Sequence, residues 1–434
     1  MLEKKEYKGM WFLPKHPEHK VAGTLYFSPN ENIKLELIGS FCETSIETLF
    51  ADTEDKNTNV IHGIVYSDNK VEDITLFDCY SSQKYNFSCD FPLITYFCRS
   101  VFVGKLIESK EDKLFDKIRL FIPCLKDWFS YRPIKHCICS ESDTSRIYQW
   151  EISEKDKYIK SFLLDDKTTL SFNAVAGFEE RDEGGFVLYE DTYVDIETNE
   201  KVSYRELYQK AFLFKDFLSL SILSNVPFSE IVLFDYNDYQ EYDNGKKRYN
   251  NTPVYFVAKD YLLTKHPTYN YLFRFVDIKT EFADIIQKWY AESENLAPIR
   301  RHLINSITYK KEFSSIDFLT IIQSVQGYYY RFIDDDQKKH LRKQLDDLYN
   351  KFRDIVFVNK NVADYDRVIA SRNYYSHFYS KDNQQNICDG RDLYELTKKL
   401  RLLLICSTLS LVGFSNQKIE SFLKNSNKII SIYA

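Results

Sequence analysis

The residues that could do chemistry lie in one short segment near the C-terminus, Ser371-Arg372-Asn373-Tyr374-Tyr375-Ser376-His377. If this segment is helical, at about 100° per residue, Asn373 and His377 lie about 40° apart and share one face. Arg372 lies about 140° from His377, so these two do not share a face of an ordinary helix. A common site for all three therefore requires the long arginine stem to curl, an irregular turn, or a second copy of the helix.

These three residue types suit the cleavage of an RNA strand without a metal ion. Histidine as a residue type titrates near neutrality, so His377 can take the proton from a ribose 2′-hydroxyl or give one to the departing 5′-oxygen. The guanidinium of Arg372 can hold the scissile phosphate and stabilise its transition state, and Asn373 can orient the imidazole or a phosphate oxygen. The alternative is that the string arose by chance and that His377 is only a partly buried, hydrogen-bonded residue.

Stronger signatures of other chemistry are missing from the sequence. It contains no GxxxxGK[ST], GxGxxG, HExxH or GxSxG motif and no paired CxxC. The segment His136-Cys137-Ile138-Cys139 offers three soft ligands, but a structural zinc site usually needs wider spacing and a fourth ligand, so we expect no metal and no cofactor. The segment His16-Pro17-Glu18-His19 contains a proline that prevents a regular helix interior, so we expect an exposed loop there.

The residue pattern of the first part of the chain predicts mainly β-strands. Residues 21–41 show a turn at 28–32 followed by alternation, which predicts a β-hairpin. Further strands are expected at 61–66, 74–77, 97–106, 118–122, 186–189, 231–234 and 253–258. Short strands with few helical patterns between them favour antiparallel sheets or a sandwich. One long helix is predicted over 204–223 from apolar residues at helical spacing.

From about Asp277 onward the pattern is almost purely helical. The expected helices are 277–293, 315–333, 336–356, 362–380, 391–414 and 416–428, which predicts an antiparallel bundle. The run Asp334-Asp335-Asp336 is expected at an exposed helix start, where negative charge suits the helix dipole. The most apolar stretch, Leu400–Phe414, contains Arg401 and is shorter than the about 20 residues of a membrane span, so we expect a buried core helix.

Charge and cysteine content narrow the class of protein. The formal net charge is −6, which gives no global attraction to nucleic acid or anionic lipid. Residues 271–434 carry +5, all of it after Asn350, and residues 1–270 carry −11, so any attraction for phosphates is expected near the C-terminus. The nine cysteines are odd in number and scattered, and no basic-then-apolar leader opens the sequence. We therefore expect a cytoplasmic protein with no membrane segment.

At Arg372-Asn373-x-x-x-His377 the sequence resembles the RNx3H form of the motif of HEPN ribonuclease domains. The segments Lys8–Pro14 and Val21–Phe27 resemble the opening of the N-terminal domain of ApeA-like proteins, which are bacterial anti-phage proteins with a C-terminal HEPN domain. Three further parts of the chain resemble later landmarks of the same family and occur in the same order. They are Leu125–Phe129, Phe217–Leu220 with Val226-Pro227, and Phe318–Gln323. The resemblance thus covers nearly the whole chain.

The resemblance implies an RNA endonuclease used in abortive defence and held inactive until infection. HEPN domains typically pair so that two motifs face one cleft, and cleavage would leave a 2′,3′-cyclic phosphate and a 5′-hydroxyl. It implies His377 as general acid or base, Arg372 as phosphate clamp and Asn373 as the polar residue beside it. Two positions depart from the pattern: Gln326-Gly327 stands where a glutamate is expected, and Phe378 rather than a small residue follows His377.

Residues around the motif could support RNA binding. Stacking on unpaired bases is conceivable for four aromatic residues, Tyr374, Tyr375, Phe378 and Tyr379. Arg367 and Lys381 flank the motif and could contact the RNA backbone. In a chain with 33 Tyr and 33 Phe, packing is the alternative for each aromatic ring, and solvated charge is the alternative for the two cations.

The sequence therefore predicts an α+β protein in two parts. A β-rich sensor or regulatory region spans 1–268, with a further break near 125–160, and an all-α HEPN bundle spans 269–434. The expected partners are RNA, with tRNA or another structured RNA among the candidates, a second copy bound through the HEPN domain, and a phage-derived trigger. Two alternatives remain. The bundle could bind RNA or protein without catalysis, or the N-terminal region could bind a carbohydrate or phage component while the bundle only oligomerises.

Overall fold

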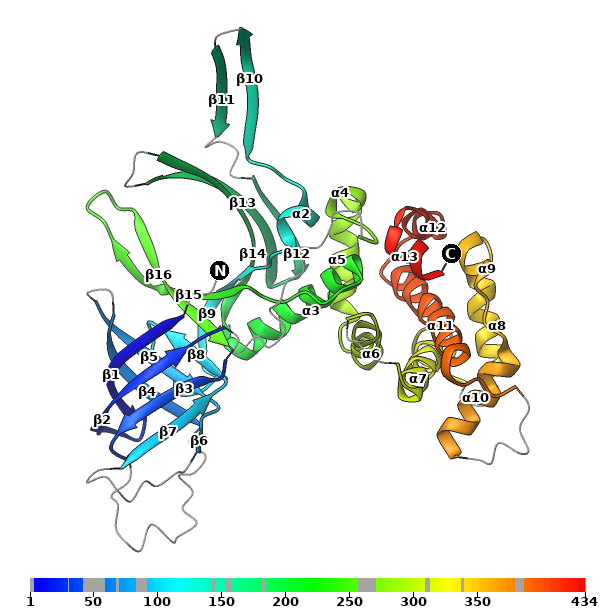
Figure 1. Cartoon of the computed structure of the whole chain (residues 1–434), viewed down its shortest axis with the longest axis horizontal. Helices are drawn as coiled ribbons and strands as arrows, with labels where there is room; N and C mark the ends of the chain where they lie inside the picture. Colours follow the sequence, from blue (N-terminus) through cyan, green and yellow to red (C-terminus); the bar gives the residue numbers. More distant parts are fainter. Residues whose placement is uncertain are drawn as a thin grey trace, which may run out of the picture.

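The chain folds into a large antiparallel sheet followed by a helical bundle, which confirms the predicted α+β fold class (Figure 1). The computed structural model describes residues 4–29, 31–41, 59–67, 70–82, 92–142, 145–152, 158–181, 185–256, 271–308, 313–336, 339–378 and 386–433.

Within these residues, one continuous sheet has the strand order β12-β13-β14-β9-β15-β16-β8-β5-β4-β1-β2-β3-β7-β6, and β10 pairs with β11 in a separate ribbon. We call the first eight strands the first lobe: β1 (Lys5–Leu13), β2 (His16–Phe27), β3 (Ile33–Ile38), β4 (Val60–Ser67), β5 (Lys70–Phe77), β6 (Tyr80–Ser82), β7 (Leu93–Cys98) and β8 (Ser100–Val103). The second lobe contains β9 (Lys113–Phe121), β10 (Ile134–Ser142), β11 (Ser145–Ile152), β12 (Tyr158–Asp165), β13 (Thr168–Arg181), β14 (Gly185–Ser203), β15 (Glu230–Glu241) and β16 (Lys247–Phe256).

The first lobe forms because alternate side chains of its strands are apolar. In β3, for example, Ile33, Leu35 and Leu37 are buried while the residues between them are partly exposed. The hairpin predicted over 21–41 is confirmed, since β2 pairs antiparallel with β3. The buried side chains of these strands form a core around Trp11, which is fully buried.

Two expectations for the first lobe are wrong. The strand predicted over 97–106 is two strands, because the chain turns between β7 and β8 and the Arg99 N–H donates to the Phe77 carbonyl. The segment from His16 to His19 is exposed as expected, but it is the start of β2 rather than a loop. Proline fits there because these first residues precede the main ladder of β2 with β1.

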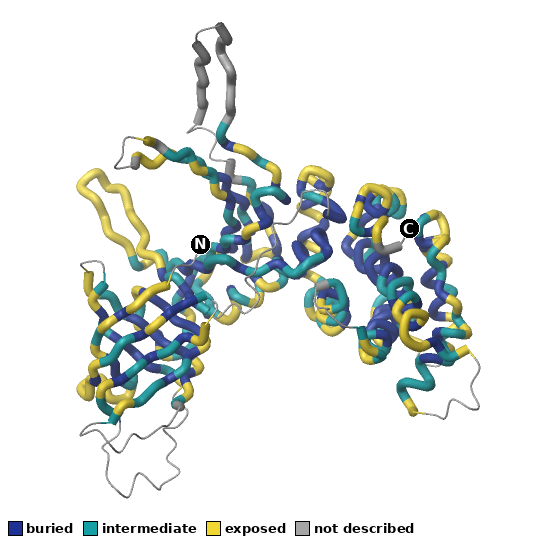
Figure 2. Tube along the Cα trace, viewed as in Figure 1, coloured by how far each residue is buried: buried dark blue, intermediate teal, exposed yellow. Residues whose placement is uncertain are grey.

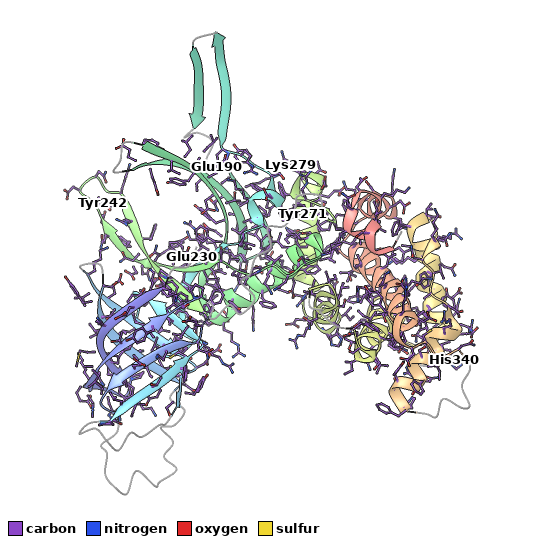
Figure 3. All side chains as sticks on the ribbon, in the orientation of Figure 1. Glu190, Glu230, Tyr242, Tyr271, Lys279 and His340 are labelled. Atoms are coloured by element: carbon purple, nitrogen blue, oxygen red, sulfur yellow. The ribbon has the colours of Figure 1, made fainter. Side chains whose placement is uncertain are left out.

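The second lobe places one face of its sheet against α3 (Tyr204–Ile222), which confirms the predicted long helix. Its start has a capping box, in which Glu206 N–H donates to Ser203 Oγ (3.2 Å) and Ser203 N–H to Glu206 Oε2 (3.4 Å). The short helix α2 (Leu125–Phe129) packs on β14. Glu190 of β14 pairs with Lys126 (2.9 Å) and accepts from the Ile134 N–H (3.0 Å), so it ties α2 and the base of β10 to the sheet (Figure 3).

The bundle follows α4 (Phe275–Ile278). Its helices are α5 (Phe282–Ala291), α6 (Ala297–Thr308), α7 (Ser315–Phe332), α8 (Leu341–Lys351), α9 (Val356–Lys360), α10 (Tyr365–His377), α11 (Gly390–Leu411), α12 (Asn416–Asn425) and α13 (Asn427–Tyr433). The buried core helix predicted at Leu400–Phe414 is confirmed as the second half of α11. No helix of the described residues is long and apolar enough to cross a membrane.

Three details of the predicted bundle are wrong. The helix expected over 277–293 is divided into the end of α4 and α5, and the one over 336–356 is only α8, since α9 begins at its last residue. Helix α6 was not predicted, although Pro298 in its first turn and Ile299 and Leu303 on its buried side mark a helix start and an apolar face. Asp334 to Asp336 follow α7 instead of starting a helix, because Asp334 pairs with Lys339 (2.5 Å) in the connection to α8.

A continuous buried core joins the second lobe to the bundle, whereas the first lobe has a separate core (Figure 2). Trp128 of α2 is fully buried, packs on Phe217 and Phe282, and donates its indole N–H to the Phe273 carbonyl (3.1 Å). Arg300 of α6 donates to Asp216 of α3 (3.1 Å) in a buried ion pair. These contacts fix the bundle, and with it the segment 371–377, to the sheet.

Candidate functional site

Helix α10 carries the segment that the sequence singles out. It begins at the N-cap Asp364, whose carboxylate accepts from the N–H groups of Asp366 (3.0 Å) and Arg367 (3.2 Å). It ends at His377, and Phe378 is the C-cap residue. The helix is therefore regular through the whole motif, which excludes an irregular turn as the way to unite its residues.

One face of α10 is anchored to the start of α11. The Cys388 N–H donates to Ser371 Oγ (2.9 Å), and the Tyr375 hydroxyl hydrogen-bonds the Cys388 carbonyl and Asp389 Oδ1, both at 3.1 Å. Burial, reinforced by Asp389, raises the pKa of Tyr375 to about 12, so its hydroxyl keeps its proton and donates. Ser371 and Tyr375 thus define the inward face of the helix.

The predicted site residues lie on the other side. Asn373 is about 200° around the helix from Ser371, and His377 follows on the same outward face, where it is exposed. Arg372 Nη1 donates to Asn373 Oδ1 (3.1 Å), so the arginine stem curls toward the outward face within one chain. The structure thus brings Arg372 and Asn373 together and places His377 one turn further on, at the solvent-exposed end of the helix.

The arrangement suits acid–base chemistry on a phosphodiester. A charged guanidinium held by an amide oxygen can grip a phosphate, and an exposed imidazole one turn away can exchange a proton with an oxygen of the same group. Arg372 and His377 lie on one helix whose opposite face is hydrogen-bonded to α11. This attachment holds the backbone positions of the two residues at a constant separation.

Two family models match the chain. The model described as ApeA N-terminal domain 1 matches residues 6–289, which is more than half of the chain. The chain belongs to the ApeA-like family. The model described as Apea-like HEPN matches residues 321–418, which include α10 and the whole motif. No curated protein matches the chain, and no solved structure matches it either.

The resemblance found in the sequence is thus confirmed: the chain is an ApeA-like protein with a C-terminal HEPN domain, of the kind found in HEPN-type defence proteins. Domains of the HEPN type are generally nuclease-related. The matched ranges leave residues 290–320 between them, so the division at 268 and 269, like the break near 125–160, stays a prediction.

Several residues near the HEPN motif have structural roles. Tyr375 is committed to α11, and its ring lies edge-on to Tyr374 (4.9 Å) and near Phe318 of α7 (6.5 Å). Arg367 forms an ion pair with Asp392 of α11 (2.6 Å) at the surface, which favours the alternative of an ordinary solvated charge for this cation. Tyr379 and Lys381 lie outside the described residues.

The position that departs from the family pattern lies at a helix–helix contact. Gln326 of α7 donates to Gln344 Oε1 of α8 (3.3 Å), and the buried Gln344 amide in turn donates to the Tyr330 hydroxyl (2.7 Å). A glutamate could not donate this first hydrogen bond. Gln326 therefore supports the α7–α8 contact in the HEPN domain.

Sequence reasoning missed the residues that orient α10. Ser371 and Tyr375 stand at the i, i+4 spacing of one helix face, a signal that was available. Their partners Cys388 and Asp389 lie on the far side of a chain connection, which no local pattern reveals.

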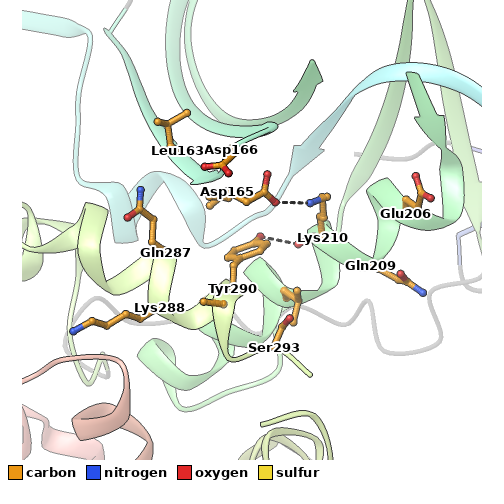
Figure 4. A pocket seen from close by; sticks show the side chains of 13 residues that line it. Leu163, Asp165, Asp166, Glu206, Gln209, Lys210, Gln287, Lys288, Tyr290 and Ser293 are labelled. Carbon is orange, nitrogen blue, oxygen red and sulfur yellow. Dashed lines mark hydrogen bonds and ion pairs between the residues drawn. The ribbon is translucent and has the colours of Figure 1, made fainter. Parts of the chain in front are cut away.

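A second site of interest is a pocket of about 640 Å³ between the end of β12, the first half of α3 and the end of α5 (Figure 4). On its wall Asp165 pairs with Lys210 (2.9 Å), and the Tyr290 hydroxyl donates to the Lys210 carbonyl (2.7 Å). Although burial acts in the opposite direction, the Lys210 ion pair holds the pKa of Asp165 below its ordinary value. None of these elements carries the HEPN motif, so the pocket is distinct from the outward face of α10.

Metal ligation finds no support in the part of the chain that the structure describes, where no group of three His, Cys, Asp or Glu side chains could hold an ion. The side chains of His136, Cys137 and Cys139, which offered the weak zinc motif, lie outside that part. The cysteines that it does describe are free, buried thiols: Cys79, Cys98, Cys124, Cys388 and Cys406.

Proposed function

We propose that this chain is a metal-independent RNA endonuclease of the HEPN type that acts in abortive anti-phage defence. The observation that carries the proposal is the outward face of α10, where Arg372 and Asn373 are hydrogen-bonded to each other and His377 is exposed one turn away. The match of the surrounding helices to the Apea-like HEPN model supports it.

The proposed reaction is an attack of the ribose 2′-hydroxyl on the adjacent phosphorus. The 2′-oxygen loses its proton to a base, the P–O5′ bond breaks, and the 5′-oxygen receives a proton from an acid, which leaves a 2′,3′-cyclic phosphate and a 5′-hydroxyl. Arg372 holds the phosphate and stabilises the negative charge of the transition state. Its contact with Asn373 keeps the guanidinium on the face that carries His377.

One imidazole cannot serve as base and acid at the same moment, so we place the complete site at the interface of two copies. In such a dimer the His377 side chains of both copies approach one phosphate, and one acts as base while the other acts as acid. Exposure of His377 at the end of α10 leaves it accessible for this pairing. The same arrangement makes the activity depend on assembly, which offers a means of keeping the enzyme inactive before infection.

The N-terminal region is proposed to regulate this assembly in response to a phage-derived trigger. Support comes from the continuous core that links the second lobe to the bundle, in which the Asp216–Arg300 pair connects α3 directly to α6. RNA is the proposed substrate, with tRNA or another structured RNA as candidates.

The proposal is tested by incubating total RNA with the wild-type chain and with the variants His377→Ala and Arg372→Ala. We expect His377→Ala to lower the cleavage rate by at least about 100-fold, the usual contribution of acid–base catalysis. Arg372→Ala should lower it by about 100-fold or more, because the charge of the transition state loses its stabilising partner. The wild-type products should carry 2′,3′-cyclic phosphates. Equal cleavage by all three proteins would contradict the proposal and favour a HEPN domain that only binds RNA or protein.

A further inference from the structure

Phe378, directly after His377, is the most exposed large apolar side chain among the described residues, with 87% of its surface accessible. Its backbone is held in the left-handed region (φ 54°, ψ 37°), and its N–H donates to the Tyr374 carbonyl (2.8 Å) to close the last turn of α10. The direction in which the side chain leaves the backbone is therefore set by the helix cap.

The C-cap of α3 shows what normally offsets such a conformation. Leu223 has the same backbone angles (φ 54°, ψ 37°), but its side chain is only 3% exposed and packs in the large core. A residue with a Cβ atom is disfavoured in this region, where glycine is the usual cap, and an exposed apolar ring gains nothing from burial. Phe378 has the unfavourable left-handed backbone and an exposed ring, and it lacks the packing that stabilises Leu223. We infer that its ring binds a partner instead of stabilising the fold.

The surroundings of Phe378 favour an RNA base as its partner. His377 is the neighbouring residue, and Arg372 presents its guanidinium on the outward face of the same helix. Two carboxylates at the start of α11 could repel a phosphate, but both have partners. Asp389 accepts a hydrogen bond from Tyr375, and Asp392 forms an ion pair with Arg367. A nucleotide whose phosphate lies at the motif can then place its unpaired base on an aromatic ring, which is how single-stranded RNA is commonly held.

We propose that Phe378 is a specificity residue that stacks on an unpaired base next to the cleaved phosphodiester, so that this chain prefers single-stranded or loop RNA over duplex. The inference rests on the proposed function, because it assumes that the phosphate lies at Arg372 and His377. It adds a selection rule that the acid–base groups alone do not supply.

The experiment measures binding in the non-cleaving His377→Ala background. The probe is a short unstructured oligoribonucleotide with a fluorescent end label, titrated by anisotropy, and the same oligonucleotide in duplex form is the comparison. Phe378 is replaced by Trp, Leu and Gly. The matched control is Phe178→Gly, because Phe178 is also exposed (62%) but lies on β13 of the sheet and not on α10.

If the ring stacks on a base, Trp retains the affinity for the single strand, whereas Leu and Gly weaken it about 5- to 150-fold, the range measured for one stacked base. Duplex affinity and the control variant remain unchanged. The Gly variant should fold at least as stably as the parent, since glycine is the preferred residue at this cap.

Equal affinity of the Phe, Leu and Trp forms would overturn the inference. It would also be overturned if Phe378→Gly dissociated the dimer in sedimentation experiments while RNA binding by the remaining dimers was unchanged, because the ring would then contact a second copy. A failure of the proposed function looks different: the wild-type chain would not cut RNA, while the dependence of binding on an aromatic residue at 378 would persist.

Discussion

The two lobes of the sheet share one hydrogen-bonded ladder but differ in what their cores contact. Side chains of the first lobe, with Tyr255 of β16, form a separate cluster around Trp11, whereas the second lobe around Trp128 shares one core with the HEPN bundle. Only a few first-lobe side chains, such as Phe77 and Phe102, belong to the larger cluster. The second lobe is therefore the structural partner of the bundle, whereas the first lobe reaches the shared core through only these few side chains.

The largest loss of stability is expected from a substitution in the core that the second lobe shares with the bundle. Trp128→Ala removes a fully buried indole that contacts the sheet, α3 and α5, so we expect a loss of about 3 to 5 kcal/mol in the free energy of unfolding. Hydrogen exchange should accelerate in both the second lobe and the bundle.

The matched variant is Trp11→Ala, which removes a side chain of the same size from the separate core of the first lobe. In this variant, hydrogen exchange should accelerate only in the first lobe. If Trp11→Ala accelerated exchange in the bundle as much as Trp128→Ala, the proposed difference between the lobes would be wrong.

The next effect concerns the ion pair between α3 and α6. Arg300→Ala leaves Asp216 buried without its partner, and burial already raises the pKa of this carboxyl, so we expect a loss of about 3 kcal/mol. Urea unfolding measures the loss. Arg353→Ala is the control, since that side chain is exposed and only loosely paired with Asp354 (3.9 Å), and it should leave the urea midpoint unchanged.

A smaller, pH-dependent effect is expected at the junction of the two lobes. Asp235 of β15 pairs with Lys105, which follows β8, and with Lys201 of β14. Burial raises the pKa of Asp235, but these two ion pairs outweigh it and hold the pKa below its ordinary value. Such a carboxyl stabilises the fold above its unfolded pKa of about 3.9, and this contribution disappears as the pH falls through the lower folded value.

Asp235→Asn should therefore cost about 1 to 2 kcal/mol at pH 7, and the difference from the wild type should shrink below about pH 4. Urea unfolding over a pH series measures it, with Asp243→Asn at the exposed tip of the β15–β16 hairpin as control. A difference that grew on acidification would show that the sign assigned to Asp235 is wrong.

Local patterns predicted the elements better than the contacts between them. The period of Leu207, Ala211 and Phe214 predicted α3 almost to the residue, because an amphipathic helix records its buried face in its sequence. The break at Arg99 was missed because its partner, the Phe77 carbonyl, lies outside any local window. Asp334 was misplaced although its partner Lys339 is only five residues away, because the negative charge suited a helix start equally well.

For the candidate site, spacing alone placed Asn373 and His377 on one face of a helix and identified the difficulty with Arg372. The hydrogen bond that brings the arginine stem to Asn373 and the attachment of Ser371 and Tyr375 to α11 required the structure. Such tertiary contacts join segments that are separated in the sequence, and no periodic pattern of residues reveals which segments will meet.

The central claim is that the imidazole of His377 carries RNA cleavage by the bundle. The most direct test is a single-turnover assay on a cleavable RNA, in parallel with the same strand carrying one 2′-deoxyribose at the cleaved nucleotide. Wild type, His377→Ala and His340→Ala are compared, because His340 is also exposed and caps α8 of the same bundle (Figure 3). The account predicts cleavage of the all-ribose strand by wild type and His340→Ala only, and no cut at the deoxy position. Full activity of His377→Ala, or cleavage at the deoxy position, would contradict it.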